Sequence, residues 1–150
     1  MASSSTALFS LAWRDRRLDG VPGRSPRRFL DYEVDGESLY DQIDEDLISC
    51  LGWFVPDEDE RAAQRLLLAG PPNIDGRVAV YVCPECGDVY CGAITVIIER
   101  QADEMVWRDA AHSNFDWLTD DWRHEPLPKV PELRFDSKEY GAALTGRPRP

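Results

Sequence analysis

Residues 77–100 read Arg77-Val78-Ala79-Val80-Tyr81-Val82-Cys83-Pro84-Glu85-Cys86-Gly87-Asp88-Val89-Tyr90-Cys91-Gly92-Ala93-Ile94-Thr95-Val96-Ile97-Ile98-Glu99-Arg100. Residues 77–82 hold a continuous apolar run, which is typical of a strand buried on both faces. Residues 93–100 are rich in β-branched side chains and predict a second central strand. After a turn at residues 101–104, residues 105–108 can pair back as a third strand. This pattern predicts a central antiparallel β-meander with a cysteine-rich hairpin tip.

Shorter elements are expected before the meander. Residues 29–34 alternate apolar and polar side chains with the period of a half-buried strand. Ser38 can cap a short helix, because its hydroxyl can accept a hydrogen bond from a backbone N–H of the first turn. A longer helix is expected from Asp57, which has a capping-box spacing to Glu60, up to the break at residues 70–72.

The last third of the chain predicts one irregular segment and a final helix. Residues 117–131 are aromatic, acidic and punctuated by proline, so we expect them to be irregular. A short strand is expected at residues 133–135. Asp136 then caps a helix in which Phe135 and Tyr140 are placed as a hydrophobic staple. With the elements above, this makes an α+β fold with about three short helices.

Length and composition fit a single domain. The chain has 150 residues, a mass of 17.0 kDa and 43% hydrophobic residues, which is enough for a core. No segment approaches the roughly 18 apolar residues of a membrane-spanning helix, and residues 1–6 lack the basic region of a signal peptide. We therefore expect a cytoplasmic single domain over residues 1–150, with residues 1–10 and 146–150 loose.

The charge of the chain is unevenly distributed. The net charge is −11, which argues against a nucleic-acid or anionic-membrane binder because those surfaces carry the same sign. Residues 14–28 contain six arginines, residues 31–60 contain twelve acids and no lysine or arginine, and residues 103–125 contain seven acids and two arginines. The acidic runs are either solvated faces or a surface that receives a basic partner.

Aromatic side chains among the acids favour the partner hypothesis, since aromatic anchors surrounded by charge are common at interfaces. They are equally what a core needs. The partner-binding residues that this hypothesis singles out are Tyr40, Asp41, Asp44, Glu45, Asp46, Trp53, Asp57 and Glu58. The segment 116–125 is an additional candidate surface.

The cysteines at the hairpin tip indicate a metal site. Zinc needs thiolates that converge at about 2.3 Å in a tetrahedron, and a Cys-x2-Cys turn followed by glycine provides this geometry. Cys83, Cys86 and Cys91 supply three thiolates. For the fourth ligand, Cys50 is the first candidate and His112 and Asp88 come next. The expected cofactor is a structural zinc ion.

Two other interpretations of these thiols stay open. A redox Cys83/Cys86 pair is one, although the strand-forming residues downstream and the acidic surroundings oppose thiolate activation. Ordinary reduced thiols in a glycine-rich turn are the other. The two histidines, His112 and His124, have carboxylates nearby but are best interpreted as exposed loop residues, and no nucleophile-elbow, phosphate-loop or dinucleotide motif is present.

Four stretches carry a resemblance to a known group of proteins: Asp31-Tyr32-x-Val34-Asp35-Gly36-x-Ser38-Leu39-Tyr40, Val82-Cys83-Pro84-Glu85-Cys86-Gly87-Asp88-x-x-Cys91-Gly92-Ala93, Val106-Trp107 and Leu133-x-Phe135-Asp136. They resemble an uncharacterised family of small acidic bacterial proteins, sometimes labelled oxidoreductases. The resemblance covers most of residues 29–145 and implies no site residues. In size and acidity the chain is also similar to immunity proteins that neutralise basic toxins.

Two functional hypotheses follow from the sequence. The first is a cytoplasmic acidic binding protein, an immunity or antitoxin-like inhibitor of a basic partner protein, with a structural cysteine knuckle. The second is a thiol-redox or metal-dependent enzyme that uses Cys83 and Cys86.

Overall fold

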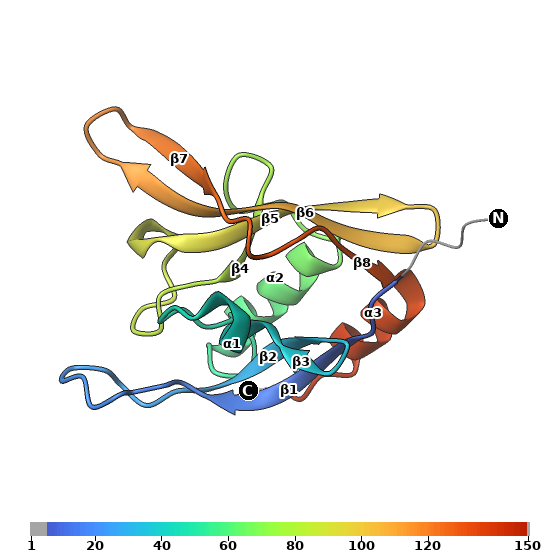
Figure 1. Cartoon of the computed structure of the whole chain (residues 1–150), viewed down its shortest axis with the longest axis horizontal. Coiled ribbons are helices and arrows are strands. Elements are labelled where there is room, and N and C mark those ends of the chain that lie inside the picture. The colour runs from blue at the N-terminus through green and yellow to red at the C-terminus, as the bar shows by residue number, and fades with distance from the viewer. Residues whose placement is uncertain (1–5, 150) are drawn as a thin grey trace.

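Two antiparallel sheets lie face to face in the computed structural model, which describes residues 6–149 (Figure 1). The smaller sheet has the order β1-β2-β3, with β1 at Phe9–Asp15, β2 at Arg28–Val34 and β3 at Glu37–Ser38. In the larger sheet the order is β4-β5-β6-β7, and β8 pairs with the other half of β6. Its strands are β4 at Val78–Tyr81, β5 at Ala93–Gln101, β6 at Glu104–Asp116, β7 at Asp121–Pro126 and β8 at Leu133–Asp136.

The predicted meander is confirmed as β4, β5 and β6, which pair antiparallel in chain order. All four residues of β4 are buried, as its continuous apolar run predicts. The third strand is longer than expected because β6 continues to Asp116 and pairs there with β7. This extension carries the β6–β7 hairpin away from the body of the molecule (Figure 1).

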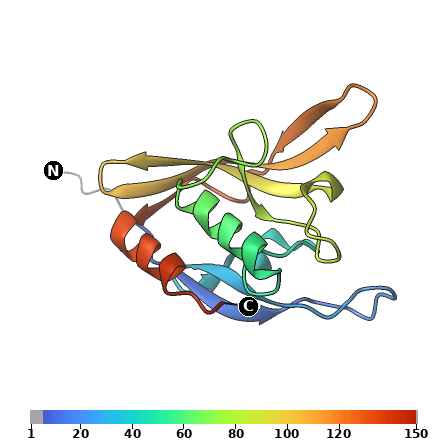
Figure 2. The same ribbon diagram turned by 180° about the vertical axis from the view of Figure 1, so that it is seen from behind.

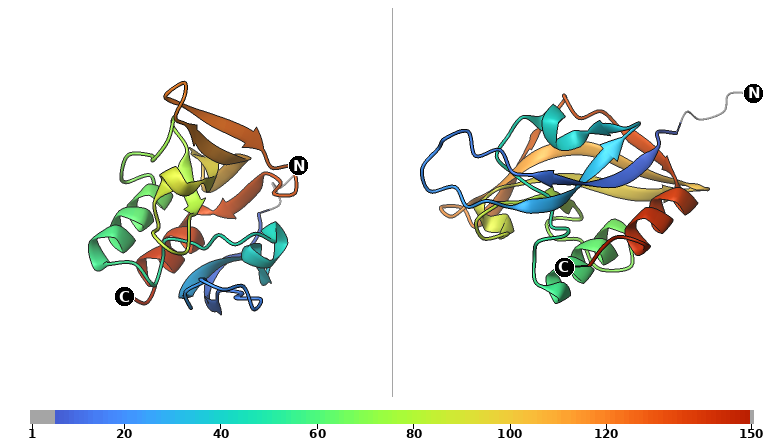
Figure 3. Two further views of the ribbon diagram at one scale, coloured as in Figure 1. Left: turned by 90° about the vertical axis from the view of Figure 1, so that its left-hand side faces the viewer. Right: turned by 90° about the horizontal axis from the view of Figure 1, so that it is seen from below.

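Three helices complete the α+β fold, and α2 and α3 lie along one flank of the two sheets (Figures 2 and 3). Helix α1 spans Leu39–Ile43, and the Ser38 hydroxyl accepts from the N–H of Asp41, as predicted. Helix α3 spans Ser137–Thr145 with the expected Asp136 cap. Helix α2 spans Pro56–Leu66 and begins earlier than expected. Pro56, whose φ is fixed and which needs no N–H partner, starts α2 in place of an Asp57 cap.

The core is centred on Trp107, which is 1% exposed and lies between the sheets and α3. Its ring contacts those of Phe9, Tyr32, Phe135 and Tyr140, with centroids 5.2–6.4 Å apart. The Trp107 indole N–H donates to the Tyr140 hydroxyl, which donates to the carbonyl of Leu66 in α2. Phe135 and Tyr140 stack at 5.7 Å, so the predicted staple contact exists. Burial of these large aromatic rings favours the closure of the two sheets on each other.

Three expectations about irregular segments differ from the structure. Strand β1 begins at Phe9, within the segment expected to be loose, and Ala7 already bridges to Phe135. Strand β7 lies inside residues 117–131. At the C-terminus, Arg147 is 6% exposed and pairs with the buried Asp59 of α2. Residues 1–5 and 150 of the expected loose ends lie outside the described residues.

Over residues 6–149, none of the helices combines the length and the apolar character that crossing a bilayer requires.

Candidate metal centre

Cys83, Cys86 and Cys91 converge at the tip of the β4–β5 hairpin. Their sulfur atoms all lie within 4.8 Å of one another, and the Sγ atoms of Cys86 and Cys91 are 3.3 Å apart. Cys83 and Cys86 belong to the turn after β4, and Cys91 ends the short 3₁₀ helix η1 at Val89–Cys91. Cys83 is half-buried, whereas Cys86 and Cys91 are exposed. The structure therefore brings together three of the four predicted ligands.

The backbone of the hairpin tip is folded around these sulfur atoms. The N–H of Gly87 donates to the carbonyl of Cys83 at 2.8 Å, and the N–H of Asp88 is directed at Cys86 Sγ at 3.4 Å. The Asp88 carboxylate accepts from the N–H of Tyr90 and so starts η1. Backbone amides that point at sulfur stabilise thiolates, which are the form that binds metals.

The thiols of the cluster have unequal pKa values. Burial opposes ionisation of Cys83, but the N–H groups of Cys86 and Glu85 hold the pKa of Cys83 below its ordinary value. A hydrogen bond with Cys86, burial and the nearby sulfur charges raise the pKa of Cys91 to about 11. Without a metal, the Cys91 thiol therefore resists ionisation beside the other sulfur atoms. A divalent cation would remove this repulsion and replace the remaining protons.

The fourth predicted ligand, Cys50, is not part of the cluster over residues 6–149. Burial raises the pKa of the Cys50 thiol to about 12. Cys50 instead lines a pocket of about 270 Å³ with Cys86, between α2 and the hairpin tip. The two reserve candidates are also engaged elsewhere, because His112 Nε2 lies 2.6 Å from the Glu45 carboxylate and Asp88 caps η1.

An exposed aromatic cluster adjoins the cysteines. The ring of Tyr90, the residue before Cys91, lies 5.2 Å from Phe115, 5.5 Å from Trp117 and 5.1 Å from Trp122. Trp117 is 72% exposed and the neighbouring Leu118 is 97% exposed. We call Tyr90, Phe115, Trp117, Leu118 and Trp122 the aromatic surface. Large apolar side chains that gather on a surface mark sites of interaction. The sequence alone indicated residues 116–125 as an additional candidate surface, but not their contacts with Tyr90.

Acidic residues lie next to the aromatic surface in the chain. Asp88, Asp120 and Asp121 are exposed, and no ion pair involves them within the described part of the chain. Asp116 is paired with Arg123 across the β6–β7 hairpin. This end of the molecule therefore presents aromatic rings beside uncompensated negative charge.

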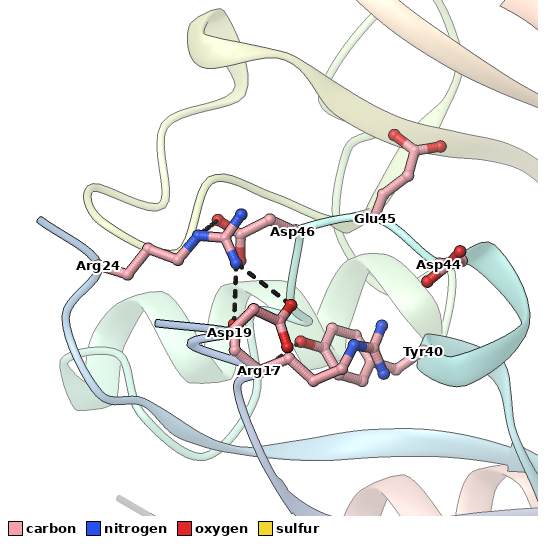
Figure 4. A pocket seen from close by; sticks show the side chains of 7 residues that line it. All are labelled: Arg17, Asp19, Arg24, Tyr40, Asp44, Glu45 and Asp46. Atoms are coloured by element: carbon pink, nitrogen blue, oxygen red, sulfur yellow. Dashed lines mark hydrogen bonds and ion pairs between the residues drawn. The ribbon is translucent and has the colours of Figure 1, made fainter. Parts of the chain in front are cut away.

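The long acidic run at residues 31–60 is largely neutralised by the protein itself. The β1–β2 connection folds back on it: Arg16 binds Asp46 through both carboxylate oxygens at 2.9 and 2.7 Å, and also binds Glu85. Figure 4 shows Arg24 directed at Asp19 and Asp46 in the same pocket. Eight of the twelve acids have a cationic group or a histidine within 4.0 Å: Asp31, Glu33, Asp41, Glu45, Asp46, Glu58, Asp59 and Glu60.

The two aromatic residues predicted to anchor a partner are engaged within the fold. Tyr40 is 1% exposed, its hydroxyl accepts from the N–H of Arg17, and the Arg17 guanidinium covers its ring at 4.1 Å. Tyr40 therefore offers almost no surface to a partner in this conformation. The Trp53 ring stacks on Phe54 at 4.7 Å, and its indole N–H donates to the Ser49 carbonyl. Only the edges of these two rings would be accessible to a partner.

The acidic members of the predicted set differ in availability. Asp41 is paired with Arg17, and Glu58 with Arg61. Asp44 ends α1 and Asp57 lies in the first turn of α2, both exposed. Most of the predicted partner-binding carboxylates are thus committed to the protein's own cations.

A serine, a histidine and an aspartate also meet, which sequence reasoning missed. Ser113 Oγ lies 2.7 Å from His124 Nδ1, and His124 Nε2 lies 2.8 Å from the Asp75 carboxylate. A hydrolytic triad needs an accessible nucleophile, with Nε2 facing the serine. Here Ser113 is fully buried, Nδ1 faces it, and its hydroxyl also bonds to Thr95. The arrangement ties β5, β6 and β7 together and does not support hydrolysis.

Comparison with known proteins gives no match to a family model, to a curated protein or to a solved structure.

Proposed function

We propose that the protein binds a basic partner protein through its aromatic surface, and that a zinc ion held by Cys83, Cys86 and Cys91 fixes the hairpin tip that supports this surface. The observation that carries the proposal is the position of Tyr90. It directly precedes Cys91 on η1 and its ring contacts three rings of the β6–β7 hairpin. The metal site and the aromatic surface are thus one structural unit.

Zinc is supported by the donor set. Soft thiolates select zinc, copper(I) or iron–sulfur clusters among biological metals, and zinc adopts the tetrahedral geometry that a Cys-x2-Cys turn provides. Three sulfur atoms within 4.8 Å of one another need little movement to bind one ion. The hairpin tip lies in a loop without regular sheet pairing, and a bound ion would add direct links between Cys83, Cys86 and Cys91.

A basic partner is supported by the charges. The chain has a net charge of −11, and the acids left without a cation near the aromatic surface are Asp88, Asp120 and Asp121 among the described residues. Such a surface attracts and orients a positively charged protein. Within this class, an immunity or antitoxin-like inhibitor of a basic toxin is the function that we propose.

A thiol-redox protein is the second candidate. The sulfur atoms of Cys86 and Cys91 are 3.3 Å apart, and the pKa of Cys83 is lowered. A reversible disulfide would require the cluster to be metal-free, because metal-bound thiolates are not available for exchange. Metal content therefore separates the two candidates.

Affinity capture with surface variants tests the proposed function. The wild-type protein, a Trp117→Ser/Leu118→Ser variant and a Leu8→Ser control are immobilised and exposed to extract of the native host. Leu8 is 54% exposed and directly precedes β1, whose first residue lies far from the tip of the β6–β7 hairpin (Figure 1). We expect wild type and control to retain the same basic protein, and the double variant to bind it at least about tenfold more weakly. Equal retention by all three proteins would refute the aromatic surface as the binding site.

A further inference from the structure

We infer that the metal at Cys83, Cys86 and Cys91 keeps its fourth coordination position open to the surface, and that this position takes a neutral nitrogen donor, the imidazole of a histidine of the basic partner. The inference rests on the proposed zinc binding. It adds to that proposal that a side chain of the partner is the fourth ligand of the metal.

The described chain supplies only three ligands. In residues 6–149, no fourth cysteine, histidine or carboxylate joins the group of ligand atoms within 4.8 Å of one another. Residues 1–5 and 150 contain none of these residue types. Zinc sites closed by four protein ligands are structural, whereas sites with three protein ligands keep one position for an exchangeable ligand.

Each side chain that could close the site has another role. Cys50 shares a pocket with Cys86 but is not one of the converging sulfur ligands, and the Phe54 ring of the same pocket packs on Gly87. Asp88 holds the start of η1 by accepting from Tyr90. Closing the site with either residue would require the hairpin tip to give up these contacts.

The cluster lies at the surface of the protein. Cys86 and Cys91 are exposed and Cys83 is half-buried, so two of the three sulfur ligands belong to residues that a ligand from outside can reach. Tyr90, the residue before Cys91, is 48% exposed and belongs to the aromatic surface. A partner that docks on this surface would bring a side chain within reach of the metal.

The charge of the site favours a neutral donor. Zinc with three thiolates carries one net negative charge, and Asp88 adds another on the same turn. A further thiolate or carboxylate would increase this repulsion, whereas imidazole adds no charge and is a common zinc ligand. Imidazole would replace solvent at the metal without any transfer of electrons.

Cobalt substitution tests the inference, because the visible spectrum of Co²⁺ responds to its ligands while Zn²⁺ is silent. The reduced protein and a Cys50→Ser variant are loaded with one equivalent of Co²⁺ and titrated with imidazole, a small thiol and acetate in separate arms. We expect both proteins to have the same starting spectrum. Imidazole should give a saturable band shift in both, larger than that from the thiol or acetate at equal concentration.

The outcomes separate this inference from the proposed function. A wild-type spectrum that changes in the Cys50→Ser variant would show that Cys50 is the fourth ligand, and would overturn the inference while leaving metal binding intact. A spectrum that is unresponsive to imidazole would overturn it as well. Failure to bind Co²⁺ or Zn²⁺ at all would instead refute the proposed metal centre. The Cys91→Ser variant serves as the control for specific loading.

Discussion

Gly87 shows how a single residue couples the hairpin tip to the rest of the fold. Its φ is +70°, a conformation that is strained for other residues. A Cβ atom built at this position would lie 2.1 Å from the Phe54 ring. Phe54 in turn stacks on Trp53. The absence of a side chain at Gly87 therefore allows the segment before α2 to pack directly against the cysteine turn.

We expect Gly87→Ala to destabilise the protein by about 2–4 kcal/mol, because backbone strain adds to the overlap with Phe54. Gly76→Ala is the matched control, since Gly76 has φ +76° and nothing within 4 Å of its Cβ position. It should cost only the backbone strain, about 1–2 kcal/mol. Urea unfolding measures both. Equal losses would show that the contact between Gly87 and Phe54 does not constrain the hairpin tip.

At the scale of elements, the connection between β1 and β2 is attached to the hairpin tip by charges. Arg16 is 6% exposed and binds Asp46, Glu85 and the Ser25 carbonyl. Hydrogen bonds from Ser25 and then Arg16 lower the pKa of Glu85 from its ordinary 4.5 to about 2. A hydrogen bond from Arg16 likewise lowers the pKa of Asp46. Arg16 thereby links the segment that contains Asp46 to the hairpin tip that contains Glu85.

These shifts predict an acid-sensitive contribution to stability. Because both pKa values are lower in the folded state, the carboxylates stabilise the fold above their ordinary pKa values, and this contribution is lost as the pH falls from about 4.5 toward about 2. In Arg16→Met the free energy of unfolding should be lower near pH 7 and should fall less over this range than in wild type. Urea titrations at several pH values measure the difference. Parallel pH profiles would contradict the role of Arg16.

Local patterns in the sequence predicted the elements that have strong periodicity or caps. The apolar run of β4, the β-branched run of β5 and the Ser38 and Asp136 caps all act within a few residues. Strand β1 was missed although Phe9, Leu11 and Trp13 alternate with other residues. Strand β7 was missed because its charged residues and Pro126 hide a period that is visible only through pairing with β6.

The candidate site could be predicted only in part, because some of its contacts join residues that are distant in the sequence. The spacing of three cysteines within nine residues is enough to predict a metal site. The contacts of Tyr90 with the β6–β7 hairpin, and of Arg16 with Asp46, join residues that are far apart in the chain. Such contacts depend on the tertiary arrangement of the strands and their connections, which local sequence patterns do not encode. The position of Cys50, outside the group of three converging sulfur atoms, depends on the tertiary fold in the same way.

Over the whole molecule, the two acidic regions differ in whether the protein's own cations pair with their carboxylates. The β1–β2 connection brings arginines onto the acidic run of residues 31–60, so this region is held together by its own ion pairs. At the end of the β6–β7 hairpin, acids and exposed rings remain without such a cover. We therefore propose that a partner is recognised beside the cysteine cluster, whereas the ion pairs of the long acidic run stabilise the fold.

The zinc content of freshly purified, reduced protein tests the central claim most directly. Native mass spectrometry of protein prepared without added metal or chelator should show one zinc ion per chain, and Cys83→Ser should abolish it while Cys50→Ser should retain it. The reason is that only the three hairpin cysteines converge. Folded wild-type protein with no bound metal and three free thiols at the hairpin tip would contradict the account.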